Sequence, residues 1–399
     1  MRSATFSSSR LLALLICMVL LSPLAIDIYL PAFPMMAESF HVGATQIQDT
    51  ITWFLFSLGF GQLFAGPMAD RFGRRPVALT GIALYSASAT LAWLAEQYEW
   101  MLVARILQGL GACAASVCAF AAVRDRFGAE RSGQMISYLN GAICFIPALA
   151  PIFGTWLTLQ FGWRSNFSFM LAYALVVWVL IWRLLPETRP QETDVSGSLF
   201  SIGRYFSVIK EPVFLYHASL CMLSMASILA YVTSAPVLLM DELGLSMGMF
   251  TFWFGLNAVV NIVCCMLAPR YMDKFGSRPA LAVGLTCIVA AGALAVALSG
   301  MTAAWAFMVP VFISSVGVAF TMGSAAGRAL APFGDRAGTA AALLGMIQMS
   351  GAGLLVSLTQ RIGLSPSHLI AFHMLLLLPG LIILFSRWGR VWHAHKTAA

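Results

Sequence analysis

The chain has 399 residues, of which 60% are hydrophobic and only 10% are charged, whereas soluble globular proteins carry about 25% charged residues. This composition excludes an ordinary soluble enzyme and indicates a polytopic membrane protein. The formal net charge is +7, but the basic residues are not gathered into a patch with interleaved aromatic residues. We therefore expect the lipid bilayer, and no nucleic acid, as a partner.

Twelve apolar windows follow one another along the chain, and each can hold the roughly 20 residues that cross a bilayer as a helix. The first six lie near residues 11–34, 46–68, 77–95, 100–122, 133–159 and 166–185. The second six lie near residues 213–240, 246–267, 280–298, 304–323, 338–359 and 367–386. The prediction is an all-α polytopic membrane protein with twelve transmembrane helices. The first window lacks a clear cleavage site, so we interpret it as a span and not as a signal peptide.

The positions of the basic residues predict the topology. Of the 23 lysines and arginines, 20 lie at the termini or in alternate loops, and such residues are retained on the cytoplasmic side. Arg164 and Arg361 fall on the opposite side, and Arg105 falls inside a span. Both termini are therefore expected in the cytoplasm, which for a bacterial cell makes this a multi-pass inner-membrane protein.

An internal repeat divides the chain into two halves. The segment MADRFGRRP at residues 68–76 returns as YMDKFGSRP at residues 271–279, so that Asp70 matches Asp273 at an offset of 203 residues. Both copies join the second and third helices of a half, in register with the topology. Such parallel six-helix repeats are typical of one transporter architecture, in which substrate binds near the midplane. We expect bundles at 1–185 and 212–399, related by pseudo-symmetry and joined by a cytoplasmic linker at 186–211.

The first copy of the repeat, GPMADRFGRRP at residues 66–76, resembles the loop signature of the major facilitator superfamily between helices 2 and 3. Glycine at position 73 permits a tight turn, and the arginines anchor the cytoplasmic face. Asp70 can favour a positive helix N-terminus, so the motif is expected to latch one conformation. The alternative is that the arginines only fix the topology. The gating residues expected from the repeat are Gly66, Asp70, Arg71, Gly73, Arg74 and Asp273.

Asp27 and Arg105 are charged residues within apolar spans, and such residues are functional candidates because their burial is costly. Both are expected at a similar depth below the outer surface, so that Arg105 is the natural partner of Asp27. A proton or a cationic substrate would change the charge at this acid, as a proton carrier requires. The alternatives are a structural ion pair, or an arginine that extends to the headgroups.

Two further motifs resemble superfamily exporters. Residues 105–112, RILQGLGA, are similar to the helix 4 motif, whose arginine the resemblance associates with proton coupling. Gly141 together with residues 150–154, APIFG, resembles the antiporter motif of helix 5, and this motif adds Pro151 and Gly154 to the expected gating residues. The motif departs from the pattern, because Ala150 and Thr155 stand in place of the usual glycines. Proline there bends a helix, and small residues permit close packing against another span. A simple kink is the alternative.

The stretches at residues 27–32, 186–190 and 331–333 together resemble the Bcr/CflA branch of drug:proton antiporters. The resemblance implies proton-coupled efflux of small amphipathic drug-like compounds, of chloramphenicol type among others, by alternating access. It implies a monomer, no cofactor, no metal and no catalytic residues. Substrate contacts are expected from aromatic and amide residues within spans, namely Tyr29, Trp53, Asn140, Tyr231, Asn257 and Gln348.

Two other readings remain open from the sequence. The same fold can export a native metabolite, such as an amino acid or sugar derivative, but a specific site needs several fixed polar groups. A membrane-embedded enzyme or a non-transporting sensor needs a catalytic cluster or a sizeable soluble domain. The sequence contains neither, and it also lacks an ATP-binding loop.

Overall fold

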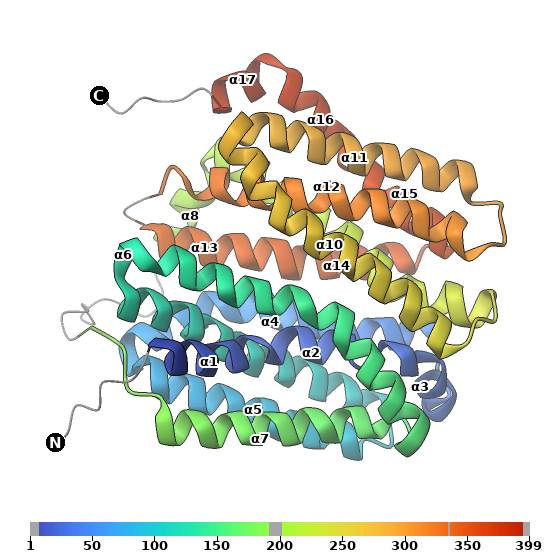
Figure 1. Cartoon of the computed structure of the whole chain (residues 1–399), viewed down its shortest axis with the longest axis horizontal. Coiled ribbons are helices and arrows are strands. Elements are labelled where there is room, and N and C mark those ends of the chain that lie inside the picture. Colours follow the sequence, from blue (N-terminus) through green and yellow to red (C-terminus); the bar gives the residue numbers. More distant parts are fainter. Residues whose placement is uncertain (1–7, 191–201, 334–335, 394–399) are drawn as a thin grey trace. The chain divides into compact units, whose positions relative to one another are not determined.

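The computed structural model describes residues 8–190, 202–333 and 336–393, and the regular structure within these ranges is all helical. The chain divides into two compact units, Met1–Ser201 (unit 1) and Ile202–Ala399 (unit 2). Figure 1 labels the helices of each unit, from blue to green in unit 1 and from green to red in unit 2.

Each unit consists of helices that follow one another along the chain. Unit 1 contains α1 (Ser8–Val19), α2 (Leu21–Asp27), η1 (Leu30–Ala32), α3 (Phe33–Phe40), α4 (Ala44–Phe72), α5 (Arg74–Leu94), α6 (Tyr98–Phe161) and α7 (Arg164–Leu184). Unit 2 contains α8 (Ile202–Ile209), α9 (Pro212–Pro236), η2 (Val237–Glu242), α10 (Met247–Phe275), α11 (Ser277–Leu298), α12 (Ala304–Leu330), α13 (Ala337–Met346), η4 (Ile347–Gly351), α14 (Ala352–Gln360), α15 (Pro366–Leu375), α16 (Leu378–Phe385) and α17 (Arg387–His393).

The prediction of twelve transmembrane helices is confirmed. Within the described ranges, 12 helical stretches are long and apolar enough to cross a membrane, from Ser9–Phe40 to Pro366–Phe385. Spans and helical elements do not correspond one to one. Span 1 runs from α1 to α3, whereas the single element α6 supplies both span 4 and span 5. The backbone of α6 leaves the helical region at Gly128, with φ 67°. Glycine adopts that conformation without steric cost, so the chain turns there.

The repeated loop has the same form in both units. Gly73 follows the last residue of α4 with φ 103°, and the matching Gly276 follows the last residue of α10 with φ 88°. Positive φ favours glycine, which explains why glycine occupies this position in both copies. The next helix starts at once, so spans 2 and 3 form a tight helical hairpin in each unit.

Small residues bring span 4 close to its neighbours in unit 1. A Cβ atom at Gly109 would lie 2.1 Å from Ser57 Oγ on α4. A Cβ atom at Gly111 would lie 2.6 Å from the Gly81 carbonyl oxygen on α5. Only glycine fits at such contacts, and this close packing fixes the position of Arg105 on the same helix.

Part of the expected linker is helical. Helix α8 lies within the range 186–211, which the sequence presented as a polar connection. Its Val208 side chain is buried, whereas Phe206 is exposed. Residues 191–201 of the expected linker lie outside the described residues.

Gly154 lies at a close contact between spans 1 and 5. A Cβ atom there would lie 1.7 Å from the carbonyl oxygen of Ile28. We predict that Gly154→Ala destabilises the protein by about 1–3 kcal/mol, because the added methyl group forces the two spans apart. The measurement is the midpoint of thermal unfolding of the purified protein in detergent.

Gly141→Ala is the matched control. It lies on the same helix, and a Cβ atom there has nothing within 4 Å. It should leave the midpoint unchanged or raise it, since alanine favours helices more than glycine does. Equal midpoints for the two variants would contradict the tight contact at Gly154.

Candidate functional site

Span 1 breaks next to its acid. Helix α2 ends at Asp27, and the chain continues through Tyr29 into the short helix η1, where Pro31 is the second residue. Proline lacks the N–H group that continues a helical ladder, so the break follows from the local sequence. The Asp27 side chain is buried, with 5% exposure. Its carboxylate makes no hydrogen bond or ion pair with any other described residue.

Arg105 lies on α6 and is completely buried. Its Nη2 donates to the carbonyl oxygen of Ala25 on span 1 at 2.7 Å. Its Nε donates to the carbonyl oxygen of Thr50 on span 2 at 3.3 Å, and its Nη1 donates to the Gln108 side-chain oxygen on span 4. One guanidinium therefore joins three spans.

Two aromatic rings complete the environment of this guanidinium. Its central carbon lies 4.9 Å from the ring centre of Tyr29 and 4.5 Å from that of Phe54. Contacts of this kind stabilise a desolvated cation. The Tyr29 hydroxyl group in turn lies 2.8 Å from that of Thr50.

The expected pairing of Asp27 with Arg105 is wrong in this structure. The guanidinium is occupied by backbone carbonyl oxygens and by Gln108, and neither carboxylate oxygen of Asp27 reaches it. The interpretation in which Arg105 extends to the headgroups is also wrong, since the residue is fully buried.

The expected substrate contacts fall into two groups, one in each unit. In unit 1, Tyr29 is buried, Trp53 is half-buried and Asn140 is exposed on α6. In unit 2, the Asn257 side-chain oxygen accepts a hydrogen bond from Ser315 Oγ at 2.8 Å. Gln348 lies half-buried on η4.

Tyr231 belongs to an aromatic cluster in unit 2. Its ring stacks on Phe254 with centroids 5.4 Å apart, and Phe307 lies 6.3 Å away. The exposed fraction of Tyr231 is 4%. Its ring therefore contributes to packing within unit 2.

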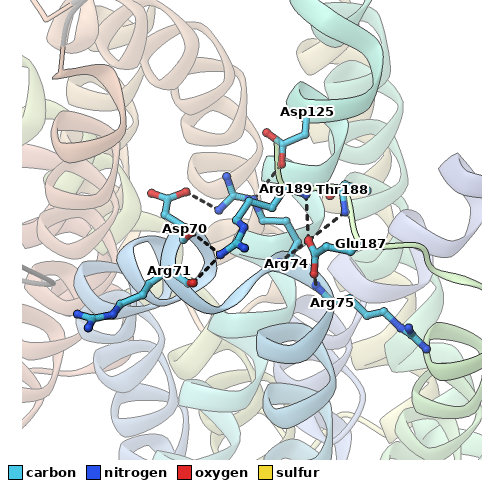
Figure 2. A network of polar contacts seen from close by, with 8 residues as sticks. All are labelled: Asp70, Arg71, Arg74, Arg75, Asp125, Glu187, Thr188 and Arg189. Carbon is cyan, nitrogen blue, oxygen red and sulfur yellow. Dashed lines mark hydrogen bonds and ion pairs between the residues drawn. The ribbon is translucent and has the colours of Figure 1, made fainter. Parts of the chain in front are cut away.

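The repeated loop of unit 1 forms a polar network, shown in Figure 2, which we call the loop network. Arg74 forms ion pairs with Asp70 and with Asp125, the latter at 2.9 Å from Nε to Oδ2. Asp70 thus pairs with an arginine four residues further along its own unit. Arg189 Nη1 donates to the backbone carbonyl oxygens of Asp70 and Arg71, which closes the end of α4.

Glu187 caps the start of α5 from the segment that follows span 6. Its Oε1 accepts the backbone N–H of Arg74 at 2.9 Å and its Oε2 accepts that of Arg75 at 3.2 Å. A Cβ atom at Gly73 would lie 2.5 Å from Oε2, so glycine is required beneath the carboxylate. Partial burial raises the pKa of Glu187, but hydrogen bonds from four backbone N–H groups outweigh it and hold the pKa below its ordinary value.

The remaining gating candidates lie apart from this network. Gly66 lies on α4 with open space around its Cα, and Asp273 is exposed near the end of α10. Pro151 and Gly154 lie on the second half of α6, both buried, where Gly154 contacts the broken part of span 1.

Sequence reasoning missed several residues that the structure brings into contact with the candidates. Gln108 lies three residues after Arg105 on one helix face, a spacing that indicates contact. Asp125 stands between two arginines in the sequence, and its charge could have indicated a role in an ion pair. The roles of Thr50 and Glu187 depend on contacts between distant segments, which the sequence does not indicate.

The comparisons with known proteins agree with this geometry. A family model described as the Major Facilitator Superfamily matches residues 15–356. The chain is 33% identical over 395 residues to multidrug resistance protein MdtL of Shigella flexneri serotype 5b (strain 8401), covering 97% of this chain and 98% of that protein. Identity to MdtL of Escherichia coli O127:H6 (strain E2348/69 / EPEC) is 32%, with the same coverage. The predicted resemblance is confirmed at the level of the major facilitator superfamily and of multidrug resistance proteins such as MdtL.

Solved structures with similar folds come from transporters. The human organic anion transporter MFSD10 (TETRAN) gives a TM-score of 0.70 at 18% identity, over 95% of this chain and 99% of that chain. A D-xylose-proton symporter gives 0.74 at 16% identity, over 95% and 97%. At such identities the likeness shows the fold alone, and it confirms the predicted fold class.

We predict that Glu187→Gln lowers stability by about 0.3–1 kcal/mol at pH 7, because the variant removes the negative charge at the start of α5. The wild-type advantage should be complete above the unfolded pKa of about 4.3. It should vanish as the pH falls through the lowered pKa of the folded state. The measurement is the difference between the two thermal midpoints as a function of pH.

Glu38→Gln is the matched control, since Glu38 is exposed near the end of α3 and caps no helix. It should show no such dependence on pH. A Glu187→Gln difference that does not shrink as the pH falls below the unfolded pKa would contradict a role for the charge of Glu187.

Proposed function

Because this chain belongs to the major facilitator superfamily, we propose that it exports small amphipathic drug-like compounds in exchange for protons. Members of this superfamily are transporters, and the chain is a membrane transporter and not an enzyme. The relatives named multidrug resistance protein MdtL support drug efflux. Across a membrane, each proton that moves inward supplies about 2.3 kcal/mol per 100 mV.

The buried and unpaired carboxylate of Asp27 is the observation that carries the proposal. A buried carboxylate without a partner is stabilised by whatever removes or balances its charge. A proton does so, and so does a cationic or hydrogen-bonding drug. The two therefore compete at Asp27, and that competition couples export of the drug to entry of the proton.

In this proposal, Arg105 holds the spans that form the site in place. Its bonds to Ala25 and Thr50 hold span 1 against spans 2 and 4 on one side of the break. Protonation of Asp27 then removes a charge beside the break, while Arg105 keeps its bonds to the backbone.

Two groups of residues are proposed to govern the change between inward and outward access. The loop network, with Asp70, Arg71, Gly73 and Arg74, stabilises one conformation at the end of spans 2 and 3, together with Gly66 and with Asp273 in the second copy. Pro151 and Gly154 on span 5 transmit movement to the broken part of span 1 through the contact at Ile28.

The substrate is proposed to meet aromatic rings and amides within spans, namely Tyr29, Trp53, Asn140, Tyr231, Asn257 and Gln348. Bundles at 1–185 and 212–399, joined by residues 186–211, supply these groups within one chain. The protein therefore functions as a monomer, without nucleic acid or cofactor. Both termini lie in the cytoplasm, and the protein resides in the bacterial inner membrane.

We predict that Asp27→Asn folds but does not couple. The test is proton release from detergent-purified protein upon addition of chloramphenicol or a lipophilic cation. Wild type should release protons when such a drug binds, and Asp27→Asn should release none, because its amide carries no titratable proton. Thermal unfolding of the variant, at a midpoint near that of wild type, shows that it is folded.

Asp49→Asn is the matched control, since Asp49 is also a buried acid, on α4. It should release protons as wild type does. Release from Asp27→Asn equal to wild type would remove Asp27 from the mechanism. Release by no drug from any form would favour export of a native metabolite, and the panel would then be cellular metabolites.

A further inference from the structure

Four polar side chains form a buried layer between spans 7, 11 and 12 of unit 2, which we call the polar layer: Thr233, Thr359, Gln360 and His373. Thr233 and His373 are fully buried, and Thr359 and Gln360 are 5% and 8% exposed. Gln360 Nε2 donates to Thr233 Oγ1 at 2.8 Å, which joins span 11 to span 7. Thr359 Oγ1 lies 3.1 Å from His373 Nε2, which joins span 11 to span 12. Helix α14, the last part of span 11, is therefore joined to each of these neighbours by a polar contact.

His373 is a titratable residue, and the tautomer of its neutral ring follows from its contacts. Its Nδ1 lies 2.8 Å from the carbonyl oxygen of Leu369. A carbonyl oxygen only accepts hydrogen bonds, so Nδ1 carries the hydrogen and Nε2 of the neutral ring is the acceptor. The Thr359 hydroxyl group therefore donates to Nε2.

The Thr359 hydroxyl group can also adapt to a protonated His373. Its oxygen lies 2.9 Å from the carbonyl oxygens of Leu355 and of Val356, one turn earlier in α14. When a proton from water binds Nε2, the hydroxyl hydrogen turns towards one of these carbonyl groups, and the hydroxyl oxygen accepts the new N–H. The polar layer thus has a hydrogen-bonding arrangement for the neutral ring and for the imidazolium ion.

The helices around His373 offer no negative charge to an imidazolium ion. Its own helix, α15, packs against α9 and α11 and contacts α14 through Thr359. None of these four helices contains an aspartate or a glutamate, and the acids that follow α9, Asp241 and Glu242, are exposed on η2. The other titratable side chains on or next to the four helices are neutral or cationic at neutral pH: Tyr216, His217, Cys221 and Tyr231 on α9, Arg278 and Cys287 on α11, His368 on α15, and Arg361 after α14. A buried cation without a counter-charge is costly within a membrane protein, so contact with water stabilises it.

The polar layer lies next to exposed chain. Residues 361–365, which follow Gln360 directly, are all exposed. Gln360 Oε1 is buried and has no hydrogen-bond partner among the described residues. An unsatisfied buried acceptor costs free energy, which entry of water recovers. The end of span 11 is therefore the side from which water and a proton reach His373.

The two sides of the contact between Thr359 and His373 differ in how firmly they are held. Span 12 is packed tightly against span 9, because a Cβ atom at Gly292 would lie 2.9 Å from the Cβ atom of Met374. Span 11 instead contains a π-helical turn, η4, directly before α14. Such a turn interrupts the regular helical ladder and is frequent at functional sites. Helix α14 is therefore the part that can move, with η4 as its hinge.

We propose that His373 binds a proton and that its charge then releases α14 from span 12, with η4 as the hinge. The imidazolium ion is more stable in contact with water than within the closed polar layer, so protonation favours a parted end of span 11. In the proposed topology this end faces the outside, where an acidic medium then favours outward access. That role rests on the proposed export, whereas proton binding and opening are measurable without drug.

The test is hydrogen exchange of the backbone amides of full-length protein in detergent, read by mass spectrometry without drug. After correction for the intrinsic effect of pH on exchange, opening of residues 352–360 in wild type should increase as the pH falls from about 8 to about 5, where imidazole titrates. The increase should be at most about tenfold per pH unit, because one proton is taken up. His373→Gln should show no increase, because its amide gains no proton.

His368→Gln is the matched control, since His368 lies on the same helix but is exposed. It should respond to pH as wild type does. Asp27→Asn should also keep the full response, which separates His373 from the exchange site in unit 1. Unchanged exchange in span 10 shows that each variant is folded, and His373→Asn replaces His373→Gln if the latter alters span 10.

Equal opening of residues 352–360 in wild type at both ends of the pH range would overturn the proposal. A full increase in the variant at position 373 would do the same. Loss of the increase in His368→Gln would assign the response to the exposed histidine, and its loss in Asp27→Asn would assign the response to the exchange site.

Discussion

The burial of Arg105 is the constraint on which the rest of unit 1 depends. In a membrane there is no water to satisfy a buried guanidinium, so the protein must supply its partners. It does so with carbonyl oxygens of spans 1 and 2 and an amide of span 4. The acceptor at Ala25 lies on the α2 side of the break that follows Asp27. The arginine therefore organises the broken helix while leaving the acid unpaired, and an unpaired acid is what exchange requires.

The repeated loop has the same helical frame in both units but carries different side chains at matching positions. Glycine with positive φ turns the chain between spans 2 and 3 in both units, and the next helix begins at the same point. In unit 1, the charges of Arg74, Asp125 and Glu187 compensate one another within the loop network. In unit 2, Arg328 stands at the position that matches Asp125, and its Nε donates to Ser277 Oγ. The frame of the loop is therefore the same in both units, while the side chains on it differ.

The spans were predictable because bilayer thickness fixes the length of apolar sequence needed to cross it. Span 1 exceeds its predicted range of 11–34 and reaches Phe40, because α3 continues the helical stretch beyond the break at Pro31. Asp27 and Arg105 were identifiable because charge is rare in apolar spans. Their pairing was predicted wrongly, because the partners of Arg105 are backbone carbonyl oxygens, which every residue carries and no sequence pattern distinguishes.

The central claim is that drug and proton exchange at Asp27, and the most direct test is transport by purified protein in liposomes. An imposed pH gradient should drive accumulation of a lipophilic cation by wild type. Asp27→Asn should exchange labelled for unlabelled drug across the membrane but should not respond to the gradient, because alternating access remains while the proton carrier is lost. Accumulation by Asp27→Asn that follows the pH gradient as wild type does would contradict the account.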